Sequence, residues 1–307
     1  MAGHETVLRK EAVDALVRNV DGRFVDCTYG RGGHSEEILK RLTPAGRLIV
    51  MDKDVDAVRD AELKFGDDER VIAVHGSFKD LHKIVAARDM IPVDGILMDL
   101  GVSSPQLDTP ERGFSFDRGG PLDMRMNQQE GMSARDWLSV ADENQIVKVL
   151  KEYGEERFAR RIARAIIEAR SSRPVETTDD LVNIIEQAIP YREKHKHPAT
   201  RSFQAIRIHV NEELTELRQC LQSVVDLLSA GGRLVVISFH SLEDRIVKRF
   251  IRDAAKGDPW PARLPIRDDQ ITRQLKIIGR PVRAGEAEVQ TNARARSAIM
   301  RVAERTG

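Results

Sequence analysis

The chain has 307 residues, long enough for one large domain or two modest ones, and its 49 basic and 49 acidic side chains give a formal net charge of zero. This balance excludes a uniformly basic nucleic-acid-binding protein, so any such contact must come from a local patch. Two cysteines, no apolar run of transmembrane length and no signal-peptide core predict a cytoplasmic protein with neither a disulfide framework nor a membrane partner.

The first notable pattern is a short apolar strand, Arg23–Asp26, followed by a glycine-rich turn and a helix from Ser35 to Leu42. The turn reads Gly30-Arg31-Gly32-Gly33. Glycine lacks a Cβ and tolerates positive φ, so backbone N–H groups there can approach a ligand closely. The helix N-terminus adds donors and a partial positive charge. The turn is therefore a candidate cofactor loop, and the alternative is an ordinary tight turn.

A second strand, Arg47–Met51, is closed by Asp52. An acid at this point of a βαβ unit is placed to accept hydrogen bonds from ribose hydroxyls. The glycine turn lacks the third glycine of the dinucleotide fingerprint, which disfavours a nicotinamide dehydrogenase. No Gly-Lys-Ser/Thr follows it, so it is not a phosphate-binding P-loop. Asp26 would repel a phosphate but suits the ammonium of an amino acid. Together these features predict S-adenosylmethionine, which carries adenosine and an amino-acid tail without a phosphate.

Two further strands, Val71–His75 and Val93–Leu100, alternate with helices and predict a parallel sheet. Ligands of such sheets bind at the carboxyl ends of the strands. Four side chains fall at these ends: Asp26, Asp52, Phe78 and Asp99. Phe78 is placed to pack on a purine, and ordinary core packing is its alternative.

The next strong strand, Arg233–Ser238, follows after a gap far longer than a usual crossover, which indicates an insertion. Gly101–Asp123 has the composition of a loop. Apolar spacing then predicts four helices: Ser133–Val140, Asp142–Leu150, Glu155–Arg170 and Thr178–Ala188. Asp142 and Thr178 are expected N-caps. We expect an inserted helical substrate-recognition subdomain over 105–200, with a core formed by 1–104 and 201–307.

The insertion carries the local basicity of the chain. Its basic side chains include Arg157, Arg160, Arg161, Arg164, Arg170, Arg173, the run Arg192–His197, Arg201 and Arg207. Such a patch suggests contact with a phosphate backbone. A solvated helix face, with nearby glutamates as partners, is an equally good interpretation of the charge alone. His195-x-His197 has no companion ligands at metal-site spacing, so we expect a basic loop and no metal.

After the insertion, a long helix from Leu214 is expected to stop at Ala230-Gly231-Gly232. The segment Ser238–Asp244 lacks the Gly-x-Ser-x-Gly of a hydrolase, so we interpret it as a substrate-binding loop, with a helix cap at Ser241 or Asp244 as the alternative. Two short runs predict a closing antiparallel pair, Leu275–Ile278 and Ala298–Val302. The proline-rich stretch between helix and pair, Asp258–Arg267, is expected to be irregular.

At this point the chain resembles the MraW-type methyltransferases, also called ribosomal RNA small subunit methyltransferase H. The matching stretches span nearly its whole length and are far more specific than a generic cofactor loop. They are His4–Leu8, Gly30–Ser35, Asp94–Ile96, Asp99–Gln106, Glu111–Phe116, Pro121–Met126, Tyr153–Arg157, His197–Arg201, Ser238–Arg245 and Ala293–Ser297. One departure is Thr291-Asn292-Ala293-Arg294, where many relatives have a proline before the arginine.

The resemblance implies a class I S-adenosylmethionine-dependent methyltransferase of the α/β class, with a Rossmann-like, mostly parallel sheet and an inserted helical subdomain. It implies methylation of N4 of a cytidine in the decoding region of 16S ribosomal RNA, in the bacterial cytoplasm. The partner is the 16S rRNA or the small ribosomal subunit. The cofactor contacts carried over from the family are Gly32, Gly33, His34, Asp52, Phe78, Asp99 and Gln106.

No catalytic residue is identified by these patterns. Many amino-methyltransferases use an Asp/Asn-Pro-Pro-aromatic tetrad, but the equivalent place here reads Asp99-Leu100-Gly101-Val102. Ser103 and His240 are our candidates for orienting the base. The alternatives are a non-catalytic S-adenosylmethionine- or RNA-binding protein and an amino-methyltransferase of another nucleic acid. The sequence leaves open whether free RNA or the assembled subunit is the substrate, and whether the protein is a homodimer.

Overall fold

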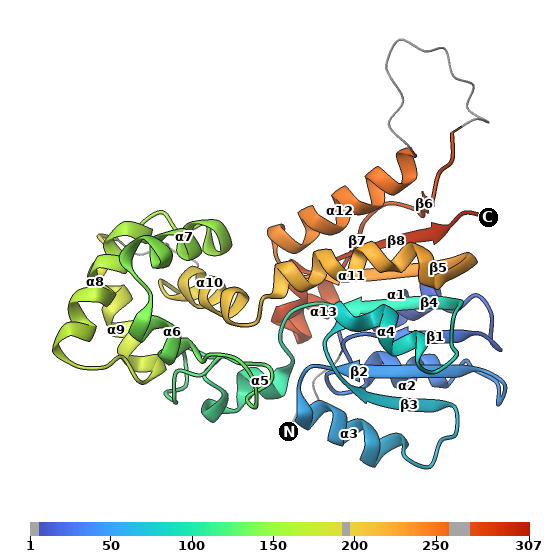
Figure 1. Ribbon diagram of the computed structural model, residues 1–307, viewed down its shortest axis with the longest axis horizontal. Coiled ribbons are helices and arrows are strands. Elements are labelled where there is room, and N and C mark those ends of the chain that lie inside the picture. The colour runs from blue at the N-terminus through green and yellow to red at the C-terminus, as the bar shows by residue number, and fades with distance from the viewer. Residues whose placement is uncertain (1–5, 192–196, 258–270) are drawn as a thin grey trace, which may run out of the picture. The chain divides into compact units, whose positions relative to one another are not determined.

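The computed structural model describes residues 6–191, 197–257 and 271–307. It divides into two compact units (Figure 1). The core unit comprises residues 1–101 and 214–307, and the inserted unit comprises residues 102–213.

The core unit is built on one sheet with the strand order β3-β2-β1-β4-β5-β8-β6, and β7 pairs with β8. The strands are β1 Arg23–Asp26, β2 Arg47–Asp52, β3 Val71–His75, β4 Val93–Asp99, β5 Leu228–Ser238, β6 Leu275–Ile277, β7 Val282–Arg283 and β8 Ile299–Arg305. The first five strands pair in parallel, whereas β8 is antiparallel to its neighbours. The strand order reverses between β1 and β4, the point where open α/β sheets bind ligands.

The inner strands β1, β2 and β4 and the second half of β5 are buried on both faces, which is why they read as apolar runs. In β2, Ile49 and Met51 enter one hydrophobic core while Leu48 and Val50 enter the other. Helices cover both faces: α4, α11 and α12 contribute to the first core, and α1, α2 and α3 to the second. The core-unit helices are α1 Arg9–Leu16, α2 Gly33–Leu39, α3 Val55–Phe65, η1 Phe78–Asp80, α4 Leu81–Ala86, α11 Glu213–Leu227, α12 Ser241–Lys256, α13 Glu286–Thr291 and η4 Ala293–Ser297. The predicted Rossmann-like class I methyltransferase fold, with its closing antiparallel pair, is confirmed.

The inserted unit is helical and has a hydrophobic core of its own. Its helices are α5 Ser104–Asp108, η2 Pro110–Arg112, α6 Ala134–Val140, α7 Glu143–Gly154, α8 Ala159–Ser172, α9 Thr178–Ala188 and α10 Thr200–Val210. The apolar positions of α8 and α9 that face inward are Ile162, Ile166, Leu181 and Ile185. The apolar faces of these helices are therefore buried largely within the inserted unit.

Helix α10 was assigned to the core by its position in sequence, but the structure groups it with the insertion, which therefore extends to residue 213 and not to 200. The reason is packing: Phe203, Ala205 and Ile206 are buried in the core of the inserted unit. The predicted loop Gly101–Asp123 also needs correction, because it contains the short helices α5 and η2.

Three predicted helix ends differ from the structure for local reasons. Helix α8 starts at Ala159, later than predicted, since Glu155 adopts a left-handed φ of 50° and ends α7. The N-cap of α9 is Thr177, not Thr178, because Thr177 accepts a hydrogen bond from Asp180 N. Helix α11 already ends at Leu227, before the glycines, which lie within β5. The predicted cap Asp142 is confirmed and forms a capping box with Gln145.

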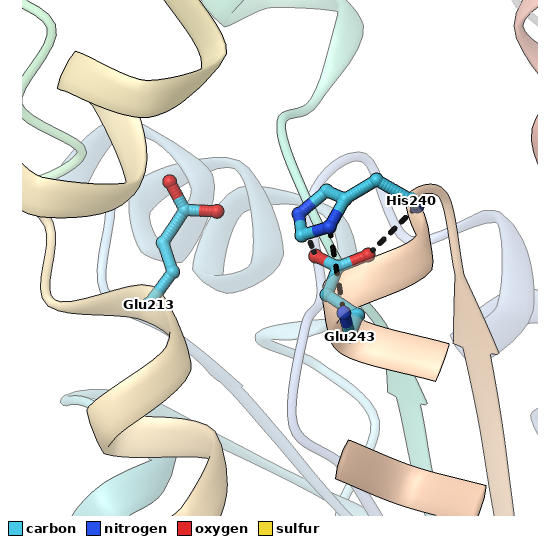
Figure 2. A group of neighbouring side chains, drawn as sticks. All are labelled: Glu213, His240 and Glu243. Atoms are coloured by element: carbon cyan, nitrogen blue, oxygen red, sulfur yellow. Dashed lines mark hydrogen bonds and ion pairs between the residues drawn. The ribbon is translucent and has the colours of Figure 1, made fainter. Parts of the chain in front are cut away.

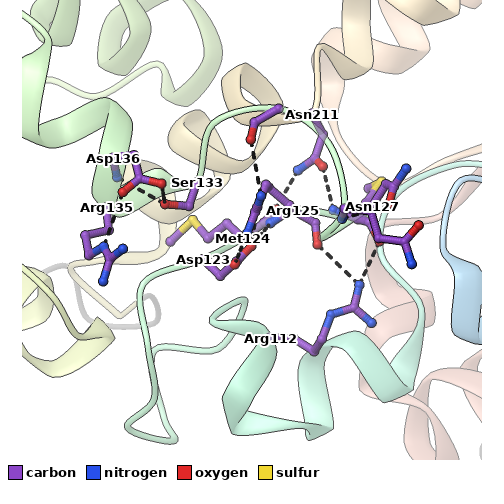
Figure 3. A network of polar contacts seen from close by, with 12 residues as sticks. Arg112, Asp123, Met124, Arg125, Asn127, Ser133, Arg135, Asp136 and Asn211 are labelled. Atoms are coloured by element: carbon purple, nitrogen blue, oxygen red, sulfur yellow. Dashed lines mark hydrogen bonds and ion pairs between the residues drawn. The ribbon is translucent and has the colours of Figure 1, made fainter.

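The segment Pro121–Met126 lacks regular secondary structure but is held firmly within the inserted unit (Figure 3). Asn211 donates to Met124 O over 2.7 Å and accepts from Met126 N over 2.7 Å. Arg112 donates to Met126 O over 2.8 Å. Met124 itself has a φ of 62° and is fully buried. This matching stretch therefore has an internal structural role, independent of any ligand.

Candidate functional site

Three acids end three adjacent parallel strands of the core unit. Asp26, Asp52 and Asp99 are the last residues of β1, β2 and β4, and β1 lies between the other two strands. Burial raises the pKa of both Asp52 and Asp99, and the nearby charge of Asp26 adds to each shift. The structure thus brings the predicted acids to one sheet edge, at the switch point between β1 and β4.

Asp26 holds the glycine turn in place. It is fully buried, and its carboxylate accepts from Thr28 N at 3.1 Å and from Ser35 Oγ at 2.6 Å. Burial raises the pKa of the Asp26 carboxyl to about 6. Asp26 thus fixes the strand–helix turn, and its contact with an ammonium group stays a prediction.

Two glycines of the turn are required by close neighbours. Gly32 has a φ of 73°, and a Cβ there would lie 2.6 Å from the Tyr29 ring. A Cβ on Gly33 would lie 1.8 Å from Thr6 Oγ1. Helix α2 then begins at Gly33 without a side-chain cap among the described residues. The turn thus combines a tight backbone, a helix start without a side-chain cap and a Gly30 N–H that donates to Asp52.

Asp52 is both anchored and able to accept further bonds. Its oxygens accept from Gly30 N at 2.8 Å and from Asp54 N at 2.9 Å. A carboxylate oxygen has two acceptor directions, so each oxygen keeps one for a ligand hydroxyl. Burial raises the pKa of the Asp52 carboxyl to about 6, against the lowering effect of these two backbone bonds. The geometry fits a ribose diol held beside the glycine turn.

At the end of β4, Asp99 lies close to the buried side chain of His34. His34 Nδ1 lies 3.7 Å from Asp99 Oδ2, and the histidine is 3% exposed. Burial lowers the pKa of His34 to about 4, so the ring is neutral near pH 7. Burial, with Asp26 and Glu243 nearby, raises the pKa of Asp99 well above its usual range. Within the described part of the chain, His34 Nε2 and Asp99 Oδ1 have no hydrogen-bond partner.

These unpaired buried atoms indicate what the site accepts. A buried polar atom without a partner is costly, and a ligand that supplies the missing partner recovers that cost. Asp99 Oδ1 calls for a donor such as an N–H or an ammonium group. Carboxyls whose pKa values are raised by burial and by one another favour a cationic ligand and disfavour a phosphate. The residues present therefore fit S-adenosylmethionine, which carries both an ammonium and a sulfonium.

Phe78 follows β3 in η1 and packs partly buried against the core that contains Leu81 and Val85. Its core-packing role is visible, while its contact with a purine stays a prediction. Ser103 and Gln106 lie in the inserted unit, where they form the capping box of α5. Gln106 Oε1 accepts from Ser103 N at 2.9 Å. The predicted contacts of these two residues with cofactor or base likewise stay predictions.

His240 is the N-cap of α12 (Figure 2), whereas the alternative interpretation of this segment placed the cap at Ser241 or Asp244. Its Nδ1 accepts from Glu243 N at 3.4 Å, and the Glu243 carboxylate accepts from Phe239 N at 2.8 Å. Asp244 instead forms a two-bond pair with Arg301 on β8, at 2.7 and 3.0 Å. Glu243 was missed by sequence reasoning, although its spacing from His240 is that of a capping box.

The structure divides the predicted basic patch into two groups. Arg170 donates to backbone carbonyls of the inserted unit, Arg173 pairs with Asp180 at 2.8 Å, and Arg207 pairs with Glu213, the third side chain in Figure 2. The remaining described members of the α8 segment are exposed and form no hydrogen bond or ion pair with any described residue: Arg157, Arg160, Arg161 and Arg164. We call these four residues the α8 arginine stripe.

Three predicted features fall wholly or partly outside the described residues. They are the stretch His4–Leu8, the basic run Arg192–His197 and the proline-rich Asp258–Arg267. Of the basic run only His197 is described; its ring stacks on Phe116 with centroids 4.6 Å apart. Among the described helices, none combines the length and the apolar character needed to span a membrane.

Comparison with known proteins gives a consistent picture. A model of the MraW methylase family matches residues 1–306. A relative named ribosomal RNA small subunit methyltransferase H from Thioalkalivibrio sulfidiphilus is 57% identical over 304 residues, which cover 98% of this chain and 97% of the relative. Relatives of the same name from Methylococcus capsulatus and Legionella pneumophila are 54% and 51% identical, and the alignments cover 96% or more of each chain. The chain therefore belongs to the MraW methylase family.

Proposed function

We propose that this protein transfers a methyl group from S-adenosylmethionine to N4 of a cytidine in the decoding region of 16S ribosomal RNA, in the bacterial cytoplasm. The observation that carries the proposal is the acidic strand-end site beside a glycine turn, in a chain of a methylase family. The name that these relatives share supports small-subunit ribosomal RNA as the substrate class.

The site residues have distinct roles in holding the cofactor. Asp52 would accept hydrogen bonds from the ribose hydroxyls, since each of its oxygens keeps a free acceptor direction. Asp99 Oδ1 would accept from a donor of the ligand. The clustered carboxyls stabilise positive charge at this edge. When bound, S-adenosylmethionine supplies a methyl group that its sulfonium already activates.

The target nitrogen determines what the protein must add. The lone pair of a cytosine amine is delocalised into the ring, so the amine is a poor nucleophile. As the N–CH3 bond forms and the S–CH3 bond breaks, the nitrogen becomes positive and its proton becomes acidic. No strong base is needed beforehand, and the main requirement is an in-line approach at near-attack distance. Ser103 and His240 are our candidates for orienting the base.

The α8 arginine stripe supplies the proposed RNA contact. Exposed guanidinium groups with no described partner are available for phosphates, at no cost of breaking an existing ion pair. The charge pattern alone left a solvated, salt-bridged helix face equally open. The lack of described partners for these four arginines favours the phosphate interpretation.

The decisive test uses 16S RNA from bacterial cells that lack this protein. Free RNA and small subunits are each incubated with purified protein and methyl-labelled S-adenosylmethionine, then digested and mapped by mass spectrometry. We expect one labelled cytidine, with the methyl on N4. Label on another atom or on another RNA would contradict the proposed target. Cofactor binding without any transfer would establish the non-catalytic alternative.

A further inference from the structure

A buried carboxylate of the core unit lies outside every predicted site. Glu216, in the first turns of α11, is 2% exposed. Its Oε2 accepts from Ser77 Oγ at 2.7 Å, and its Oε1 lies 2.9 Å from Lys53 Nζ and 3.2 Å from Lys79 Nζ. A fully enclosed acid with three such partners is a specific arrangement, because a buried charge is tolerated only when it is paired and hydrogen-bonded.

The partners of Glu216 sit beside two proposed cofactor contacts. Lys53 directly follows Asp52 at the end of β2, and Ser77 and Lys79 flank Phe78 after β3. Glu216 is 163 residues from Lys53 and 139 residues from Ser77 in sequence. One side chain of α11 therefore connects the two strand-end segments that carry the ribose acid and the aromatic ring.

Local bonds join the two segments to each other but leave α11 out. Gly76 N donates to Asp52 O over 2.9 Å, and His75 Nε2 lies 3.1 Å from Lys53 O. Glu216 adds a third point of attachment on α11, and its negative charge lies between two lysines that would otherwise repel each other more strongly. Both effects restrict where Asp52 and Phe78 can lie before any ligand arrives.

We propose that Glu216 is a positioning residue for the nucleoside half of S-adenosylmethionine. It holds the segments after β2 and β3 so that Asp52 and Phe78 are preset for the ribose and the base. This inference rests on the proposed function, since it assumes that the nucleoside binds at these strand ends.

The test compares Glu216→Gln with Asp226→Asn, an exposed acid on the same helix with no described partner. Calorimetry measures binding of S-adenosylhomocysteine and of methylthioadenosine, which has the nucleoside half alone. We expect Glu216→Gln to weaken both ligands about tenfold. The KM for S-adenosylmethionine should rise by a similar factor, with kcat within about twofold of wild type. Asp226→Asn should change none of these values.

Ser77→Ala provides a second measurement, because it removes the bond from Ser77 to the carboxylate and keeps the charge of Glu216; it also removes the η1 cap bond from Lys79 N, which the double variant controls for. We expect a smaller loss of methylthioadenosine affinity, and the double variant should lose no more than Glu216→Gln alone. If Glu216→Gln folds poorly, the loss caused by Ser77→Ala decides the inference by itself.

Two results would overturn it. One is a Glu216→Gln protein with a lowered melting temperature but wild-type affinity for both ligands, which would make the residue merely structural. The other is unchanged methylthioadenosine affinity in Ser77→Ala. A wild-type protein that binds neither ligand would instead remove the proposed function, so the two failures are distinguishable.

Discussion

The two units handle charge in opposite ways. In the core unit, the strand-end acids are buried or partly buried, lie on adjacent strands and have raised pKa values, and Asp99 keeps an oxygen with no described partner. In the inserted unit, the α8 arginine stripe is exposed and without described partners. A buried cluster selects a small cationic ligand by a few directional bonds and is little screened by salt. An exposed stripe suits a long polyanion and is strongly salt-dependent.

The largest effect is expected from Asp52→Ala. The ribose loses its acceptor, so S-adenosylmethionine binding should weaken by about 100-fold, or about 3 kcal/mol. Calorimetry at low and high salt measures the loss, which should be the same at both because the site is buried. Asp226→Asn serves as the control. Unchanged affinity would contradict the site itself.

The complementary experiment targets the stripe. Replacing Arg160 and Arg164 with alanine should weaken RNA binding about tenfold at low salt and flatten the slope of log Kd against log salt by about 1.4. Cofactor affinity should not change. Lys10→Ala with Arg18→Ala removes two exposed charges from the core unit as a control. A salt slope identical to that of wild type would mean that these arginines form a solvated helix face and do not contact RNA.

The pH dependence of stability and of cofactor binding further distinguishes the acidic site of the core unit from the α8 arginine stripe. The pKa values of Asp26 and Asp52 are raised to about 6, so the free folded protein holds protons that the unfolded chain releases near pH 4. Their contribution to stability is therefore present at low pH and lost as pH rises through about 6. A cationic ligand reverses this preference, because it stabilises the ionised carboxylates.

Cofactor affinity should consequently fall about tenfold between pH 7 and pH 5, and binding near pH 6 should release protons. Calorimetry in two buffers with different ionisation heats measures the release. Asp52→Asn should bind weakly at every pH and show a smaller dependence. Proton uptake on binding would have the wrong sign and would contradict the electrostatic account.

The smallest effect concerns His240. Loss of its capping bond in His240→Ala should lower the free energy of unfolding by about 1 kcal/mol, with Ser241→Ala as a neighbouring control. Denaturant unfolding measures this change. Single-turnover methyl transfer then tests the orienting role: normal rates in both His240→Ala and Ser103→Ala would leave these residues with helix capping alone.

Sequence reasoning succeeded where one local property determines the structure. The strands were predicted because burial on both faces makes them apolar throughout, and Asp52 and Asp99 were found because they terminate such runs. Glycine spacing located the turn, and the positive φ of Gly32 has a direct steric cause. These features depend on neighbours in the chain.

What could not be predicted depends on distant partners. Glu216 is an unremarkable helix glutamate until Lys53 and Ser77 surround it. Arg170 and Arg160 lie on one helix and look alike in sequence, but only the first finds carbonyl partners. The predicted end of the insertion was wrong because the sequence does not show which core buries Phe203, Ala205 and Ile206 of α10.

The inserted unit begins shortly after β4 ends at Asp99, and the chain returns to the core unit at α11, before β5. Strands β4 and β5 nevertheless pair directly, so the pairing between these two strands does not involve the inserted residues. Exchanging that segment for another would leave the strand pairings of the core sheet in place, together with Asp52 and Asp99, but it would remove Gln106, the proposed cofactor contact in the inserted unit. The sheet can therefore be retained while the helical unit changes, provided that the new segment supplies an equivalent of Gln106.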